Sequence, residues 1–89
     1  MIRPEVRELD AAHRLLSRLA DERGLSNLRH GDGAGEVVAD VEQGRTYFDI
    51  VAFEDDVEGR LGWRPEVVDA EAPGARPGRA VGTGQSHAA

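Results

Sequence analysis

Three glycines stand at positions 31, 33 and 35 of the stretch RHGDGAGEVVAD, residues 29–40, followed by a short apolar run and an acid. A glycine-rich turn that leads into a strand lets backbone N–H groups approach a phosphate, so this stretch is a candidate nucleotide-binding turn. The same composition also suits a plain flexible connection, and both interpretations stay open. A P-loop is excluded, because its lysine must reach the phosphates and this chain contains no lysine.

Carboxylates that follow the glycines are candidates for holding a metal ion. Asp40 and Glu42 have the i, i+2 spacing that puts two side chains on one face of a strand, although solvated acids at a turn would show the same spacing. Glu36 and Asp40 also share a face, but they lie about 13 Å apart at the rise of a strand, which is too far for one ion.

The spacing of the histidines does not indicate a metal site or a catalytic site. His13, His30 and His87 are scattered along the chain and lack zinc-ligand spacing. His30 could pair with Asp32 as an acid and a base, but no serine or cysteine nucleophile accompanies them. The chain contains no cysteine, so disulfides and thiolate metal sites are excluded.

The net charge of −6 is unevenly distributed along the chain. Between Glu36 and Glu58 there are eight acids, and Arg45 is the only base. This charge would repel a phosphate backbone, so nucleic-acid binding is not expected. Four of these acids belong to one predicted helix, where we expect a solvated face or a surface for a basic partner: Glu54, Asp55, Asp56 and Glu58.

Two amphipathic helices are predicted to support this region. The first covers residues 4–23, with an apolar stripe of Val6, Leu9, Ala12, Leu16 and Leu19 and a stop at Gly24. The second follows Thr46 and Asp49, whose spacing resembles a capping box, and its apolar positions recur at helical spacing: Ile50, Phe53, Val57 and Leu61.

Short strands are predicted at residues 25–29, 37–41 and 63–68, with Trp63 in the core. A strand–helix–strand crossover of this length places its two strands parallel in one sheet. The sequence therefore predicts a small α/β layer over residues 4–69, with two helices on a mixed sheet of two or three strands. Residues 70–89 are rich in Ala, Gly and Pro without periodicity, and we expect them to be disordered.

The size and hydropathy of the chain bear on partners and location. An 89-residue chain buries only about 60% of its unfolded surface, so we expect a partner chain or self-association as a homo-oligomer. No apolar run approaches the roughly 20 residues that cross a bilayer, and residues 1–10 contain no apolar signal segment. We therefore expect a cytoplasmic protein that does not bind membranes.

A resemblance covers roughly residues 12–69. The sequences GRT at 44–46, FDIVAFEDDVEGRLG at 48–62 and RPEVV at 64–68 resemble the second half of the minimal nucleotidyltransferases of the polymerase-beta-like superfamily. Intact members hold a triphosphate on a Gly-Ser turn and bind Mg²⁺ through an Asp-x-Asp pair and a third carboxylate. Many of these proteins are antitoxin partners of HEPN toxins.

The resemblance implies a set of site residues, in a degenerate form. Gly31 stands nearest to the phosphate-binding turn, Glu36 falls on the second carboxylate of the pair, and Glu66 takes the place of the third. Ala34 occupies the first carboxylate position, and the Gly-Ser is absent. Two functions follow as alternatives: transfer of a nucleotide from ATP with Mg²⁺, retained or weakened, and a non-catalytic acidic module that binds a HEPN-type toxin or another basic protein.

Overall fold

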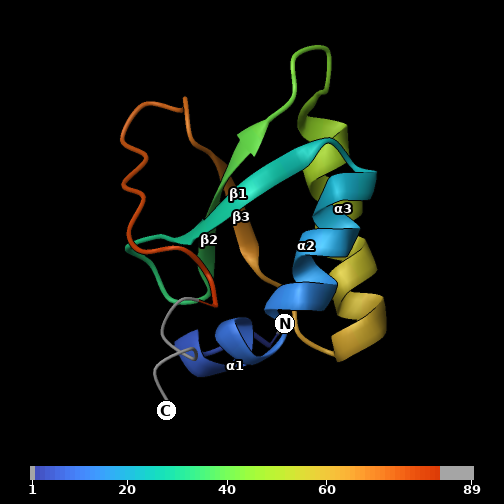
Figure 1. The fold of residues 1–89 in the computed structure, drawn as a ribbon, viewed down its shortest axis with the longest axis vertical. Helices are drawn as coiled ribbons and strands as arrows, with labels where there is room; N and C mark the ends of the chain where they lie inside the picture. Colours follow the sequence, from blue (N-terminus) through green and yellow to red (C-terminus); the bar gives the residue numbers. More distant parts are fainter. Residues whose placement is uncertain (1, 83–89) are drawn as a thin grey trace.

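The structure, a computed structural model, describes residues 2–82 as a three-stranded sheet with helices packed on one face (Figure 1). In chain order the elements are α1 (Val6–Ala11), α2 (His13–Glu22), β1 (Leu25–His30), β2 (Glu36–Val41), α3 (Tyr47–Leu61) and β3 (Glu66–Asp69). The two longer helices, α2 and α3, lie side by side on the same side of the sheet. None of the helices within residues 2–82 is long and apolar enough to cross a lipid bilayer.

The sheet is mixed, with β2 in the middle. β1 and β2 run antiparallel and are joined by the glycine turn, whereas β2 and β3 run parallel and are joined through α3. The parallel register pairs Glu36 with Glu66 and Val37 with Val67. These pairings confirm the predicted α/β class, the mixed sheet and the parallel strand–helix–strand unit.

The amino-terminal helix differs from the prediction, because it is broken in two at Ala12. The ring of His13 bonds the Asp10 carbonyl at 2.9 Å and so competes with the backbone N–H that would continue the helix. Glu5 caps α1 through a reciprocal pair with Glu8. Val6, predicted on the buried stripe, is 54% exposed, and the break instead buries Asp10.

The long helix α3 begins and ends as its sequence predicts. Thr46 and Asp49 form the capping box, in which the Thr46 hydroxyl accepts from Phe48 N–H at 3.2 Å and Asp49 accepts from Thr46 N–H at 3.0 Å. Gly62 closes the helix in the left-handed region, where a glycine costs least. The residues buried by α3 are Ile50, Phe53 and Val57, and Trp63 joins them in the core as predicted.

The core lies between α2, α3 and the sheet, and the central strand β2 is buried on both of its faces. Val37 and Ala39 of β2 belong to the main apolar cluster. Val38 points the other way by strand alternation, and it is fully buried as well. A hydrophobic side chain on each face of β2 is therefore removed from water, which strengthens a small sheet.

The expectation of a disordered segment from residue 70 onward is corrected for residues 70–82, which form a loop whose last part, residues 78–82, runs along the outer edge of β1 (Figure 1). The His30 N–H donates to the Arg79 carbonyl at 3.0 Å, Gly78 N–H to the His30 carbonyl at 2.7 Å, and Val81 N–H to the Leu28 carbonyl at 2.9 Å. The composition lacks apolar periodicity, but backbone pairing with an open strand edge does not require it. Residues 83–89 lie outside the described part of the chain.

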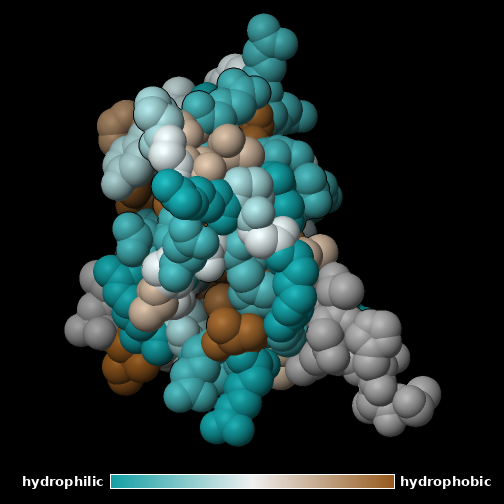
Figure 2. Space-filling view, turned by 90° about the vertical axis from the view of Figure 1, so that its left-hand side faces the viewer, coloured by the Kyte–Doolittle hydropathy of each residue, from teal (hydrophilic) through white to brown (hydrophobic). Residues whose placement is uncertain are grey.

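The folded region thus extends past the predicted boundary at residue 69. We name residues 78–82 the edge segment, since they pair with the edge of β1. Figure 2 views the molecule from the side on which these last described residues lie in Figure 1. That face is mostly hydrophilic, and its hydrophobic residues form separate small areas instead of one patch.

Candidate functional site

The glycine turn between β1 and β2 is closed by the chain's own carboxylate. Gly33 N–H donates to Glu36 Oε1 at 2.7 Å, and Gly31 N–H donates to the Glu36 carbonyl at 3.0 Å. A Cβ added at Gly31 would lie 2.7 Å from Glu36 Cδ, so the glycine makes room for this side chain. The Glu36 side chain therefore fills the glycine turn with a negative charge.

The two acids proposed as metal ligands, Glu36 and Glu66, are neighbours in the structure. They are register partners at the start of the parallel strands β2 and β3. Each carboxylate is already engaged, because Glu36 accepts from Gly33 N–H and Glu66 pairs with Arg3 at 3.0 Å. Within residues 2–82, no three His, Asp or Glu side chains gather closely enough to hold a metal ion.

The alternative pair, Asp40 and Glu42, is held by bases and does not form a metal site. Asp40 accepts from Arg29 Nη2 and, at 3.1 Å, from Asn27 Nδ2. Glu42 accepts from Arg45 Nε at 3.1 Å. The i, i+2 spacing on this strand therefore serves two separate ion pairs.

The acids of α3 pair with arginines, although Asp55 and Glu58 remain exposed as predicted. The Arg64 guanidinium donates to three carboxylates, those of Glu54, Asp55 and Glu58. These contacts, the one with Asp55 foremost, raise the pKa of Arg64. Glu54 is mostly buried and also accepts from Val67 N–H at 2.8 Å. Glu54 therefore has a structural role in holding β3 and Arg64 against α3.

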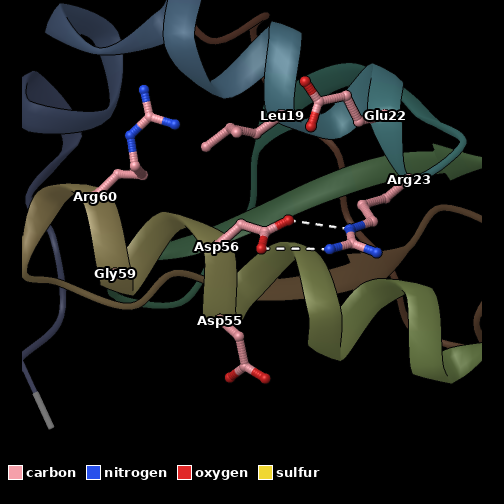
Figure 3. A pocket seen from close by; sticks show the side chains of 7 residues that line it. All are labelled: Leu19, Glu22, Arg23, Asp55, Asp56, Gly59 and Arg60. Carbon is pink, nitrogen blue, oxygen red and sulfur yellow. Dashed lines mark hydrogen bonds and ion pairs between the residues drawn. The ribbon is translucent and has the colours of Figure 1, made fainter.

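A groove of about 410 Å³ runs between α2 and α3, lined by Leu19, Glu22, Arg23, Asp55, Asp56, Gly59 and Arg60 (Figure 3). Asp56 of α3 accepts from the guanidinium of Arg23 at 3.0 and 3.4 Å, which joins the two helices across the groove. A Cβ added at Gly59 would meet nothing within 4 Å, so the groove is open there. Glu22 leaves an exposed carboxylate on the α2 wall, whereas Asp55 pairs with Arg64 and its side chain points away from the groove in Figure 3.

A buried polar cluster centred on Asp10 was not foreseen from the sequence. Asp10 is 4% exposed, and its Oδ1 lies 2.8 Å from His30 Nε2. Arg79 donates to both carboxylate oxygens, at 2.7 Å to Oδ2 and 3.3 Å to Oδ1. Gly82 N–H donates to Oδ1 at 2.6 Å. These donors, Arg79 above all, hold the pKa of Asp10 well below its usual range, although burial opposes them.

The cluster also replaces the expected pair of His30 and Asp32. His30 bonds Asp10, and Asp32 instead pairs with Arg76 at 3.7 Å on the surface. Within the described residues His30 Nδ1 is buried and has no hydrogen-bond partner. No local pattern could reveal this cluster, because the partners of Asp10 lie 20 and 69 residues away in the sequence.

The first turn of α3 exposes two aromatic side chains. Tyr47 is 71% exposed and Phe48 is 81% exposed, whereas Phe53, on the core-facing side of the same helix, is buried. Aromatic side chains with this exposure are frequent anchors in protein interfaces.

Comparisons with known proteins give no further assignment of the site. No family model matches the chain, and neither a curated protein nor a solved structure matches it significantly.

Proposed function

We propose that this protein is a non-catalytic protein-binding module built on the layout of a minimal nucleotidyltransferase. The observation that carries this proposal lies in the glycine turn. Glu36 Oε1 accepts a hydrogen bond from Gly33 N–H at 2.7 Å and so takes the position that a phosphate would need. A triphosphate would have to displace this carboxylate and would then face its negative charge. Asp32 in the same turn adds a second repelling carboxylate.

The groove between α2 and α3 is the proposed binding surface. Its α2 wall exposes Glu22, and the Arg23–Asp56 pair fixes the spacing of the helices. A basic amphipathic helix fits such a groove, with an arginine opposite Glu22 and an apolar side chain near the open space above Gly59. The resemblance suggests an all-helical HEPN-type toxin as the natural partner, met in the cytoplasm.

A charge reversal at Glu22 tests this proposal. Glu22 is exposed and does not bridge the helices, so Glu22→Lys keeps the fold. The probe is a synthetic amphipathic peptide of about 18 residues with arginines on its polar face. We expect the variant to bind about tenfold more weakly, and we expect affinity to fall with added salt.

Glu71→Lys is the matched control, because it makes the same charge change on an exposed residue outside the groove. Amide chemical shifts should move at Leu19–Arg23 and at residues 55–60 in the unmodified protein and in this control. Equal loss of binding in both variants, or shifts confined to other residues, would contradict the proposal.

Residual nucleotidyl transfer is the second candidate, and one observation favours it. Glu36 and Glu66 are register partners on parallel strands, so two Mg²⁺ ligands could converge if Arg3 and Gly33 released them. Under this candidate, millimolar ATP with Mg²⁺ raises the Tm and Glu66→Gln abolishes the increase. Glu71→Gln, which changes an acid outside this region, must keep it. An unchanged Tm in the unmodified protein rejects the candidate.

A further inference from the structure

The outer edge of β1 is occupied by a strand that the chain supplies itself. Three backbone hydrogen bonds join the edge segment to Leu28 and His30, and Arg29 and Ala80 form an antiparallel bridge. The pairing is that of a peptide added to the edge of a sheet. The backbone of β1 is thus competent to bind an extended chain.

The site at this edge has a receptor part that belongs to the body of the fold. Asp10 and His30 are 4% and 8% exposed and are fixed by α1 and β1. The ligand part is more superficial, since the side chain of Arg79 is 44% exposed. The carboxylate receives a guanidinium in a two-pronged arrangement that a lysine cannot reproduce.

Two glycines of the edge segment show that a bound strand has no room for a side chain at two positions, one on either side of the arginine. A Cβ at Gly78 would lie 3.1 Å from the His30 carbonyl oxygen. A Cβ at Gly82 would lie 2.6 Å from the ring of His13, and the φ of +94° at this residue also favours glycine. Between them, Val81 packs against the core. The site therefore selects the pattern Gly-Arg-x-apolar-Gly in an extended conformation.

We propose that the edge of β1 together with Asp10 is a binding site for an extended, arginine-bearing peptide strand, which the edge segment fills in cis and a partner strand of the same pattern fills in trans. This site is separate from the α2–α3 groove and does not depend on the function proposed for it. The surrounding surface is hydrophilic (Figure 2), so backbone pairing and the buried carboxylate provide the recognition. A tethered segment acts at an effective concentration of about 1 mM or more, so a partner must compete with it.

The test uses full-length chains and a capped hexapeptide with the sequence of residues 77–82, Pro-Gly-Arg-Ala-Val-Gly. Arg79→Ala weakens the resident segment and leaves the receptor intact. We expect this variant to bind the peptide at least about tenfold more tightly than the unmodified chain does, with shifts at the Leu28 and His30 amides. A peptide with Lys in place of Arg should bind about tenfold more weakly.

The control variant is Arg76→Ala, which removes an exposed arginine three residues earlier that pairs with Asp32 and not with Asp10. It should bind the peptide no better than the unmodified chain. Adding Asp10→Asn to Arg79→Ala should abolish the arginine preference. If Arg79→Ala unfolds, Val81→Pro releases the segment through its backbone, because it removes the N–H that bonds Leu28. No saturable binding to the folded released variant, or equal binding of the Arg and Lys peptides, overturns the proposal.

Discussion

Replacement of Asp10 by asparagine tests the docking of the carboxyl-terminal residues most directly. The change keeps the size of the side chain but removes its charge, and it places an NH₂ group where an oxygen now accepts hydrogen bonds. Among the described residues, the Arg79 guanidinium, the Gly82 N–H and the His30 ring donate to Asp10. All of them lose an anionic acceptor, while the fold around α1 keeps its apolar contacts.

The expected cost follows from the burial of the two partners. Breaking a buried charge pair costs about 3–5 kcal/mol, and a single hydrogen bond to a charged group is worth about 1.5–3 kcal/mol. The Arg79 side chain is 44% exposed, so solvent screens its part of the interaction and lowers the upper value. We expect Asp10→Asn to reduce the free energy of unfolding by about 2–3 kcal/mol.

Urea denaturation measures this loss, and amide hydrogen exchange locates it. Protection should fall at the His30, Gly78 and Val81 amides, which form the pairing with the edge segment, before it falls in α3. Asp32→Asn is the control, because Asp32 is exposed and its pair with Arg76 is 3.7 Å long, so it should change stability by less than about 0.5 kcal/mol. A loss below about 0.5 kcal/mol for Asp10→Asn, or unchanged protection at these amides, would refute the reasoning.

Three further predictions concern the acid stability of Asp10, the glycine turn and the core. The pKa of Asp10 is lowered in the folded state, so its stabilising contribution is complete above its unfolded pKa of about 3.9 and is lost as the pH falls further; acid unfolding followed by circular dichroism should show a smaller loss in Asp10→Asn. Gly31→Ala should cost about 0.5–1 kcal/mol in urea denaturation, since its Cβ displaces the end of the Glu36 side chain, and Glu36→Ala should remove most of that cost in the double variant. Phe53→Ala should lower stability by about 3–5 kcal/mol, whereas Phe48→Ala, at an 81% exposed position, should change it by less than about 0.5 kcal/mol; similar costs for both would contradict the packing described here.

Locally encoded features of the fold could be predicted from the sequence. The helix α3 begins at Thr46 and Asp49 and buries Ile50 and Phe53, because capping and apolar periodicity act over a few residues. The mixed sheet follows from the same level of information, since the length of the crossover determines that β2 and β3 run parallel.

Features that depend on distant partners could not be predicted. The burial of Asp10 depends on contacts with residues 30, 79 and 82, and nothing near Asp10 in the sequence signals these contacts. The edge segment is a similar case, since backbone pairing leaves no trace in composition. Around the candidate turn, the sequence placed Glu36 and Glu66 at one site, but it could not show that Gly33 and Arg3 already engage their carboxylates.

The contact between Glu54 and the Val67 backbone bears on how readily the protein aggregates through the edge of β3. Glu66 of β3 and Ala70, the residue after the strand, donate their N–H groups to Gly35 and Ala39, so strand alternation directs the Val67 N–H outward. Glu54 accepts this outward donor at 2.8 Å. An incoming strand from another molecule finds that position taken, and an anionic side chain stands beside it. We therefore infer that the Glu54 carboxylate opposes edge-to-edge pairing of β3 with a strand of another molecule. A Glu54→Ala substitution would remove this protection.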